Sequence, residues 1–445
     1  MEQQLTDGLV MRTLSAGYAD DAAQLPDFYV RVFSEDESDP HPEFLGEWTH
    51  DLIGGTHPTL TPDDVWCVVD QQRDDKVVSA LLLIPQTWRY GDVAFGLGRV
   101  ELVATDAQYR HKGLVRRMFG ALHERSAALG HLAQGITGIP HYYRRFGYGM
   151  SLPLGYRWEI AFAHVPERKA GEAPRFSLRA ATVHDAPQIA EWDAADGQRG
   201  LLSVVRTADD WRYEITGKRD ESIVRWDVLI IQQNTPTPRD VGYVIARKVR
   251  GARVVQVYQY VMGDESSYLA TFDDVLRGLV AHGESMTADG DKPAGLISFS
   301  SDISAAIDTL ARKTGGRSIN PLYAWYMRVP DLGAFLRHVA PVLERRLVGS
   351  AAHRFDGEIK LSFYDRSGLL LRFADGRLKA AETVQIGDER VNGALAYDMF
   401  LNLIFGMHSL REIQTVLPEC WLDKTAHTVI EAIFPQGRAL VYPRG

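Results

Sequence analysis

The spacing of apolar and polar positions in the N-terminal part of the chain predicts strands that lead into an amphipathic helix. Apolar runs rich in β-branched and aromatic residues predict strands at Val65–Asp70, Val77–Trp88 and Arg99–Thr105. A helix is predicted from Gly113, because apolar residues recur about every 3.6 positions until Gly130 ends the pattern. The apolar face of this helix consists of Leu114, Val115, Met118, Phe119, Leu122 and Leu129. This segment is expected to form an α/β unit.

A degenerate repeat of this unit is indicated further along the chain. Two segments share an apolar residue, an arginine, an aspartate and a second apolar residue: Met11, Arg12, Asp21 and Leu25, then Leu178, Arg179, Asp185 and Ile189. Each reads as a strand that enters a helix with acids in its first turn. The second copy continues with a predicted strand at Val254–Val261 and a helix at Tyr268–Leu279. The polar segment 166–174 separates the two copies.

The pattern changes near Trp325. One helix is predicted after Pro330-Asp331, and its core face carries Leu332, Phe335, Leu336, Val339, Leu343 and Leu347. Hairpins are expected around 365–368 and 375–376, and two further helices around 396–405 and 422–432. The expected architecture is two related α/β units followed by a small α+β domain.

Composition narrows the class of protein. The chain has 445 residues, 45% of them hydrophobic and 24% charged, which is typical of a soluble protein with two or three domains. No apolar run approaches the roughly 20 residues of a membrane helix, and the first residues do not resemble a secretory leader. The only cysteines, Cys67 and Cys420, exclude a disulfide scaffold and a zinc ribbon. A cytoplasmic location is expected.

Charge is distributed unevenly. The net charge of −9 argues against a nucleic-acid partner. No Lys or Arg occurs between Arg31 and Arg73, a stretch that contains Glu35, Asp36, Glu37, Asp39, Glu43, Glu47, Asp51, Asp63, Asp64 and Asp70. Such a stretch attracts cations if it lines a cleft, and otherwise forms a solvated acidic surface.

Two motifs carry the candidate chemistry. Arg110-His111-Lys112-Gly113 opens the predicted helix directly after a strand, where unpaired backbone amides and flanking bases favour an anion. This pattern resembles the pyrophosphate-binding R-x-x-G-x-[GA] of the GNAT acetyltransferase superfamily, with Val115 in place of the last small residue. The segment 141–149, HYYRRFGYG, resembles the element that follows the coenzyme A helix in Eis (enhanced intracellular survival) proteins. Taken alone, Tyr143 would read as a packed aromatic.

The resemblance to the Eis family covers the whole chain. It implies tandem GNAT-like domains, α/β in class, followed by an α+β domain with the fold of sterol carrier proteins. The implied boundaries are 1–165 for the catalytic domain, 175–325 for the degenerate copy and 326–445 for the last domain. At the matching helix start the second copy has Asp264 and Glu265 instead of bases. Those carboxylates would repel a pyrophosphate, so one acetyl-CoA per chain is expected. No metal is expected.

The resemblance also assigns roles to residues. The pantetheine arm is expected to pair with the backbone of Val103 and Thr105. The diphosphate is expected at the loop that comprises Arg110, His111, Lys112, Gly113 and Leu114.

Tyr143 is expected to be the general acid that protonates the departing thiolate, with a backbone amide near Val103 stabilising the oxyanion. The carboxylate of Gly445 is expected to be the base for the acceptor amine, or else part of a frayed end. The acceptor is expected to contact Phe33, Glu35, Trp48 and Trp192. Asp63 and Asp64 are expected at the surface.

The implied function is transfer of acetyl from acetyl-CoA to amino groups of small cations such as aminoglycoside antibiotics or polyamines. Two alternatives stay open: acetylation of lysine in a protein or peptide, and carriage of an apolar ligand by the C-terminal domain. No membrane or nucleic-acid partner is expected. The resemblance implies a homo-oligomer, specifically a hexamer.

Overall fold

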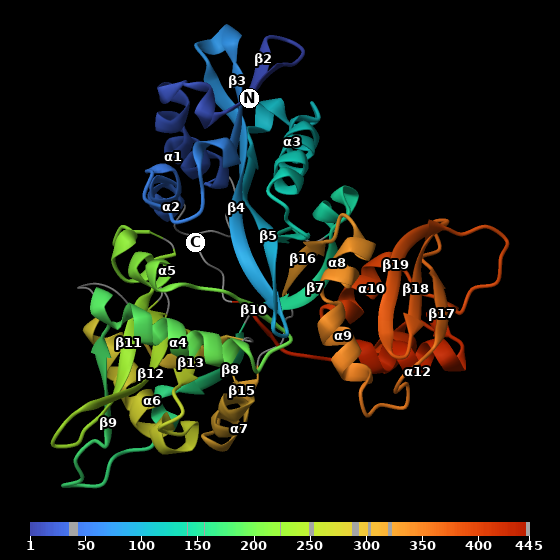
Figure 1. Cartoon of the computed structure of the whole chain (residues 1–445). Helices are drawn as coiled ribbons and strands as arrows, with labels where there is room; N and C mark the ends of the chain where they lie inside the picture. The colour runs from blue at the N-terminus through green and yellow to red at the C-terminus, as the bar shows by residue number, and fades with distance from the viewer. Residues whose placement is uncertain are drawn as a thin grey trace.

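The computed structural model describes residues 1–34, 43–139, 141–154, 156–222, 224–248, 253–286, 293–300, 304–318 and 323–441. These residues form three sheets of ten, seven and five strands, each covered by helices (Figure 1). Within these ranges, no helix is both long enough and apolar enough to cross a membrane. Cys67 and Cys420 are both buried and are not joined in a disulfide.

The first sheet has the order β1-β2-β3-β4-β5-β6-β16-β7, with β10 attached to β4 and β22 attached to β10. Its strands are β1 (Glu2–Gln4), β2 (Leu9–Thr13), β3 (Val65–Asp70), β4 (Lys76–Tyr90), β5 (Val93–Thr105), β6 (Ala133–Thr137), β7 (Gly149–Leu154), β10 (Leu202–Val204), β16 (Tyr323–Arg328) and β22 (Ala439–Leu440). The three strands predicted in this region are confirmed as β3 and as parts of the longer β4 and β5.

Helices cover both faces of the first sheet because side chains alternate along its strands. On β4, Leu82 faces a core with α1 (Ala19–Phe33) and α2 (Glu43–Ile53). The neighbouring Leu81 faces the opposite core with α3 (Leu114–Ala128), which confirms the helix predicted after Gly113. Figure 1 shows α1 and α2 on one side of β4 and β5 and α3 on the other.

The second sheet has the order β15-β8-β14-β13-β12-β11-β9. Its strands are β8 (Tyr156–Ala161), β9 (Phe176–Ala180), β11 (Asp227–Gln233), β12 (Arg239–Lys248), β13 (Val254–Met262), β14 (Leu296–Ser300) and β15 (Arg317–Ser318). One face packs against α6 (Tyr268–Ser285) and α7 (Ala305–Lys313), and the other against α4 (Ala186–Gly197) and α5 (Ala208–Arg212). The strand and helix predicted for the second copy are confirmed as β13 and α6.

Several strands lie in a sheet outside their expected domain. β8 lies in the second sheet between β14 and β15, although it precedes the polar linker. β16 lies in the first sheet between β6 and β7, although it follows the second sheet in the chain. The short strands β10 and β22 also join the first sheet from the second and third units, so sheet membership departs from the expected boundaries by four strands. Periodicity predicts a strand but does not say which sheet accepts it.

The third unit is the expected α+β domain. Its sheet, in the order β19-β18-β17-β20-β21, consists of β17 (Gly357–Ser362), β18 (Ser367–Ala374), β19 (Arg377–Gln385), β20 (Gly393–Ala394) and β21 (Trp421–Leu422). Its helices are α8 (Leu332–His338), α9 (Ala340–Leu347), α10 (Tyr397–Ile404), α11 (Leu410–Val416) and α12 (Lys424–Ile433). The single helix predicted after Asp331 is wrong: Pro341 cannot donate to a carbonyl of the preceding turn, and two helices form.

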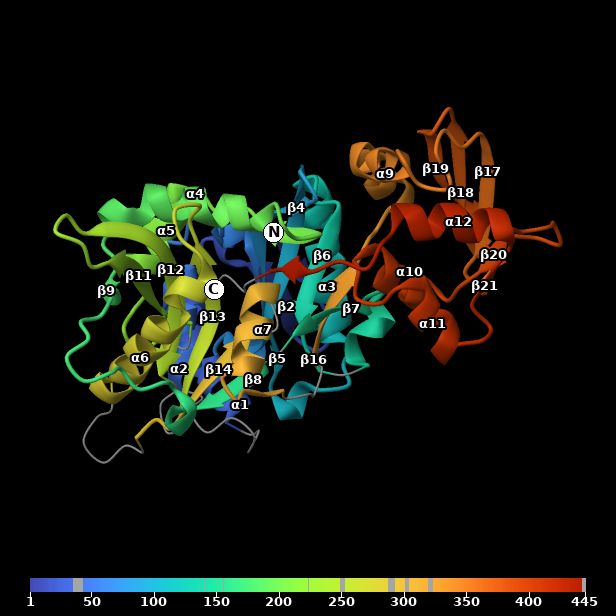
Figure 2. The same ribbon diagram turned by 90° about the horizontal axis from the view of Figure 1, so that it is seen from below.

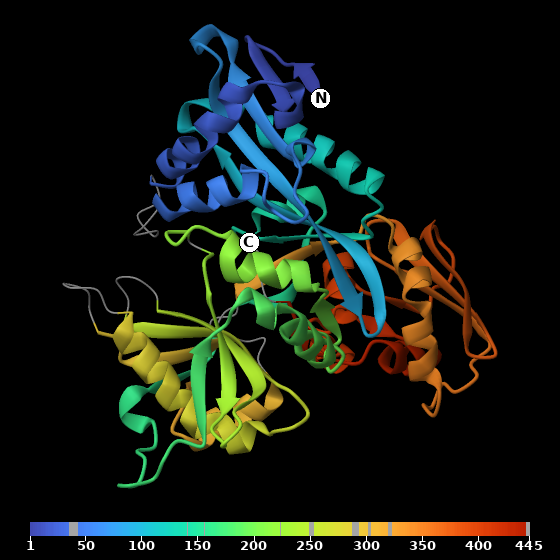
Figure 3. The same ribbon diagram turned by 60° about the vertical axis from the view of Figure 1, so that its left-hand side comes forward.

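A shared hydrophobic core joins the third unit to the end of the first sheet at which β4 turns into β5. Tyr90 of β4 packs edge-on against Phe335 of α8 with ring centroids 5.9 Å apart, and its hydroxyl donates to the Ile404 carbonyl at 2.9 Å. Figure 2 shows the third unit at the opposite end of the molecule from β9 and α6. Figure 3 shows the second and third units side by side beneath the first.

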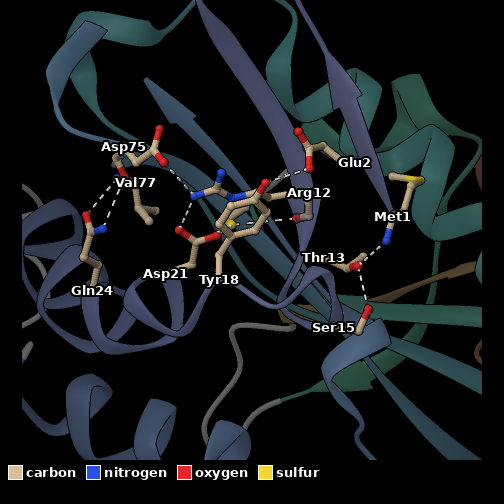
Figure 4. Close-up of polar contacts among 11 residues, drawn as sticks. Met1, Glu2, Arg12, Thr13, Ser15, Tyr18, Asp21, Gln24, Asp75 and Val77 are labelled. Carbon is tan, nitrogen blue, oxygen red and sulfur yellow. Dashed lines mark hydrogen bonds and ion pairs between the residues drawn. The ribbon is translucent and has the colours of Figure 1, made fainter. Parts of the chain in front are cut away.

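The two copies of the predicted repeat each contain an ion pair at matching positions. Arg12 of β2 donates through Nε to Asp21 of α1 at 2.5 Å, and Arg179 of β9 donates through Nη2 to Asp185 at 2.7 Å. Figure 4 shows Arg12 between Asp21 and Asp75, with the Tyr18 ring against its guanidinium. Each pair ties the strand β2 or β9 to the start of the helix that follows it.

Candidate functional site

The edge of β5 is exposed where the first sheet splays. Parallel pairing of β5 with β6 runs from Leu97↔Ala133 to Arg99↔Gly135, whereas β5 continues to Thr105. A bulge interrupts the pairing with β4 at this level, and Leu102 there has a φ of 51°. A leucine in this left-handed region is strained, and such strain persists where the surrounding structure holds it and where backbone groups are aimed at a ligand.

The loop before α3 has a backbone geometry suited to an anion. His111 and Gly113 both have positive φ, 66° and 74°, which turns successive amides toward one side ahead of the helix N-terminus. A Cβ added to Gly113 would meet no atom within 4 Å, so glycine is required for its φ while the space beside it is open. Arg110 is exposed and donates through Nε to the Thr105 carbonyl at 3.3 Å. Lys112 is partly neutralised by Asp7, 3.8 Å away.

The loop is anchored by Tyr109, which is buried below it. The Tyr109 hydroxyl donates to the Asp70 carboxylate at 2.6 Å, which links the loop to the end of β3. Asp106 accepts from Lys76 at 3.3 Å and caps the turn through the Gln108 amide at 3.2 Å. These hydrogen bonds hold the backbone of the loop without using its three basic side chains.

A cavity of about 920 Å³ joins the β5 edge, the basic loop and Tyr143. Its lining comprises Val32, Phe33, Val103, Ala104, Thr105, Tyr109, Arg110, His111, Gly113, Leu114, Val115, Arg116, Ile139, Tyr142, Tyr143, Arg145 and Phe146. The structure thus brings together Tyr143, Phe33 and all the residues expected at the cofactor except Lys112. The lining combines basic side chains with aromatic rings.

Tyr143 lies on a short 3-10 segment, Tyr142–Phe146, which we call the tyrosine turn. Its ring is 4% exposed and packs 6.0 Å from the Phe119 ring of α3 and 6.4 Å from the Tyr326 ring of β16. Gly138 makes room for it: a Cβ at that position would come within 2.0 Å of Tyr143 Cε2. The ring is therefore confined on several sides while the residue still lines the cavity.

Two titratable groups behind the tyrosine turn are held neutral. Burial raises the pKa of the Tyr148 hydroxyl well above its usual value, and that hydroxyl lies 3.0 Å from His123 Nε2. Burial, with a smaller contribution from Arg328, lowers the pKa of His123 to about 4. Tyr148 and His123 are therefore both uncharged at neutral pH.

The residues expected at the acceptor are not brought together. Phe33 lines the cavity at the end of α1, but Trp48 is buried in the core beneath α2. Trp192 lies on α4 of the second unit, against Gly263 at the end of β13. Neither tryptophan is in the lining of the cavity. Helical spacing groups Trp48 with the core residues Leu45 and Leu52, and the resemblance alone did not place either tryptophan relative to the cavity.

Glu35 and Gly445 lie outside the described residues. Asp64, expected at the surface, is buried: its carboxylate caps a turn with Thr61 and accepts from Arg125 of α3 at 2.9 Å. Asp51 is also buried, which raises the pKa of its carboxyl group, and it accepts from the Arg219 amide at 3.1 Å. Part of the acidic stretch is therefore engaged in packing rather than presented to solvent.

Sequence reasoning missed Gly138, Leu102 and Tyr326. Gly138 carried a weak signal as a glycine just before the tyrosine element, whereas Leu102 is an ordinary strand residue. Tyr326 could not be found locally, because its strand joins the sheet from far along the chain. Among the described residues, no cluster of His, Cys, Asp and Glu is suited to hold a metal ion.

Comparison with known proteins agrees with this geometry. Residues 14–151 match the family model of the acetyltransferase (GNAT) domain. These residues form a GNAT acetyltransferase domain. The protein is accordingly an acyltransferase, and GNAT domains use acetyl-CoA. The match covers α1 to β7 and contains the β5 edge, the basic loop and the tyrosine turn, so the cavity belongs to the GNAT domain.

Solved structures show that the fold extends beyond the GNAT domain. A GCN5-related N-acetyltransferase from Anabaena variabilis is similar at 14% identity and a TM-score of 0.65, over 97% of this chain and 99% of that one. A probable N-acyltransferase from Enterococcus faecalis has 12% identity and a TM-score of 0.66, over 98% and 100%. Eis1 from Mycobacterium abscessus has 13% identity and a TM-score of 0.60, over 98% and 100%. No match was found among curated proteins.

Proposed function

We propose that the protein transfers the acetyl group of acetyl-CoA to amino groups of small cationic molecules, such as aminoglycoside-like antibiotics or polyamines. The observation that carries the proposal is the single cavity of about 920 Å³ that joins the exposed β5 edge, the basic loop and Tyr143. A GNAT transferase needs these three parts together: a strand edge for the pantetheine arm, an anion site for the diphosphate, and a proton donor at the reacting end.

The residues present fit acetyl-CoA. The left-handed φ of His111 and Gly113 and the open space at Gly113 suit a diphosphate close to the backbone. Arg110, with its exposed side chain, would add a charge-assisted contact, and the backbone of Val103 and Thr105 would pair with the amides of the arm. Bound acetyl-CoA supplies a thioester carbonyl that an amine can attack.

The chain's own groups then serve the transfer step. The backbone amides at the Leu102 bulge would stabilise the negative charge that develops on the carbonyl oxygen. The Tyr143 hydroxyl would donate its proton to the departing sulfur. Its buried ring, held by Gly138 and Phe119, gives the hydroxyl little freedom to turn away.

The charge pattern supports a cationic acceptor. No Lys or Arg occurs between Arg31 and Arg73, the stretch that contains α2, and Glu43 at the start of that helix is exposed. Such a field raises the local concentration of cations. Phe33, at the cavity lining beside this stretch, offers an aromatic face to an ammonium group.

The proposal is tested by thiol release from acetyl-CoA with a panel of amines: kanamycin, spermidine, an amino-acid conjugate and a lysine peptide. Turnover of the cations well above the peptide is expected, whereas preference for the peptide would favour a protein acetyltransferase. We also propose a homo-oligomer, by resemblance a hexamer, and a monomer in light scattering at micromolar concentration would contradict this.

The cofactor site is tested by a matched pair of arginines. Arg110→Ala should raise the KM for acetyl-CoA by about tenfold or more, the effect of losing one charge-assisted hydrogen bond. Arg117→Ala removes an exposed arginine of the same region that does not line the cavity, and should leave that KM unchanged. Equal behaviour of the two variants would refute the assignment of the basic loop.

A further inference from the structure

The strand beside the tyrosine turn comes from the far end of the second unit. The turn connects β6 to β7, yet these two strands are not neighbours in the sheet, because β16 lies between them. β16 pairs with both, through Tyr326↔Ile136 on one side and Tyr326↔Met150 on the other. One inserted strand therefore separates the two strands that the tyrosine turn connects, and the geometry of the turn depends on β16.

Side chains of β16 reach both ends of the turn. At its start, the Tyr326 hydroxyl accepts a hydrogen bond from the His141 amide at 3.2 Å. At its end, Arg328 lies against Gly147, where an added Cβ would be 3.5 Å from Arg328 Nε. Arg328 is itself fixed by donation to the Gln134 side chain at 2.8 Å. Both β16 residues lie on the α3 side of the sheet, whereas Trp325 and Met327 face the opposite core.

The contact to His141 is placed where the backbone is strained. His141 has a φ of 64°, in the left-handed region that a residue with a side chain adopts only under strain. Tyr143 follows two residues later, and its ring lies 6.4 Å from the Tyr326 ring. Since Tyr326 is 4% exposed, its hydroxyl is directed at the turn from within the core.

We propose that Tyr326 is a positioning residue for Tyr143, so that the degenerate second unit contributes to acetyl transfer by delivering β16 to the catalytic sheet. This rests on the proposed role of Tyr143 as the proton donor. The Tyr326 hydroxyl holds the His141 amide, the amide holds the start of the tyrosine turn, and the turn directs the Tyr143 hydroxyl into the cavity. Tyr326 does not line the cavity, so it acts through Tyr143 and not on the substrate.

The test uses the full chain and the conservative variant Tyr326→Phe. It should lower kcat by about three- to tenfold, the effect of one lost neutral hydrogen bond, and leave the KM for acetyl-CoA unchanged. Tyr397→Phe is the matched control, since that hydroxyl donates its hydrogen bond to the Val329 carbonyl at 2.9 Å, just beyond β16, and not to the tyrosine turn. Tyr397→Phe should lower Tm by a similar amount and keep the wild-type kcat, measured with the panel amine of highest turnover.

A double-mutant cycle separates this inference from the proposed function. In a Tyr143→Phe background, Tyr326→Phe should lower kcat by less than about twofold, because residues that act as one unit are not additive. An equal loss in both backgrounds, or wild-type kcat in Tyr326→Phe, overturns the positioning role while leaving Tyr143 as the acid. Wild-type kcat in Tyr143→Phe alone overturns the proposed acid, and the positioning role with it.

Hydrogen exchange provides a readout that needs no acceptor. The His141 amide should exchange faster in Tyr326→Phe than in the wild type, while exchange in β6 and β7 stays unchanged. Unchanged protection of that amide would overturn the inference, and faster exchange across β6 and β7 together would show that the hydroxyl serves only the sheet.

Discussion

A methyl group added at Gly138 should disable the enzyme by displacing Tyr143. The Cβ of alanine would lie 2.0 Å from Cε2 and 2.6 Å from Cδ2 of the Tyr143 ring, whereas ordinary contact begins near 3.4 Å. The ring must therefore move by more than an ångström. Phe119, 6.0 Å away between ring centroids, and Tyr142, 5.1 Å away, limit where it can go.

The magnitude follows from packing and from geometry. Overpacking a core position costs about 1–3 kcal/mol of folding free energy, so Gly138→Ala should lower Tm by several degrees. A catalytic group displaced by about 1 Å costs on the order of 100-fold in rate. We expect kcat to fall by about 100-fold while the KM for acetyl-CoA, set mainly by the basic loop, changes little.

The assay is thiol release with the best amine of the panel, beside thermal unfolding. Gly120→Ala is the control: this helical glycine has no neighbour within 4 Å of an added Cβ, so alanine there should raise stability by about 1 kcal/mol and leave kcat unchanged. In a Tyr143→Ala background, Gly138→Ala should cost little stability, because the clashing ring is gone. Wild-type kcat in Gly138→Ala would refute the reasoning that the placement of Tyr143 limits the reaction.

Three further outcomes are expected. Tyr143→Phe should lower kcat more than tenfold with little change in acceptor KM, because general acids typically contribute about 10²–10⁴-fold to the rate. Wild-type kcat in steady-state kinetics would show that the hydroxyl is dispensable. The acceptor KM should rise steeply with salt while acetyl-CoA hydrolysis changes little, and a KM for spermidine that does not depend on ionic strength would show that the acidic stretch is only a solvated surface. Stability should fall as pH drops from about 6.5 toward 4, because burial lowers the pKa of His123 and His131 to about 4 and the unfolded chain takes up their protons first. Each histidine lowers the free energy of unfolding by about 1.4 kcal/mol for every unit by which the pH falls within that window. His123→Gln should flatten the urea-unfolding pH profile, and an unchanged profile would contradict the assignment.

The sequence by itself determined the local elements and the chemistry of the cofactor loop. The strand, basic loop and helix from Arg99 to Ala128 are encoded in adjacent residues, since periodicity, Gly113 and the flanking bases act over a few turns. The Arg12–Asp21 and Arg179–Asp185 pairs likewise reveal the repeat, because each lies within one strand–helix connection. Interactions of short range leave a pattern in the sequence that can be read directly.

Only the tertiary structure decided which distant segments share the site. The exchange of β8 and β16, the burial of Asp64 against Arg125, and the separation of Trp48 from Trp192 depend on which apolar faces meet once both sheets have formed. A strand has the same alternation whichever sheet accepts it, so nothing near Tyr326 indicates that it will lie beside Tyr143. The partner of such a residue is chosen by the fit of the whole fold, and that fit is not written in any single segment.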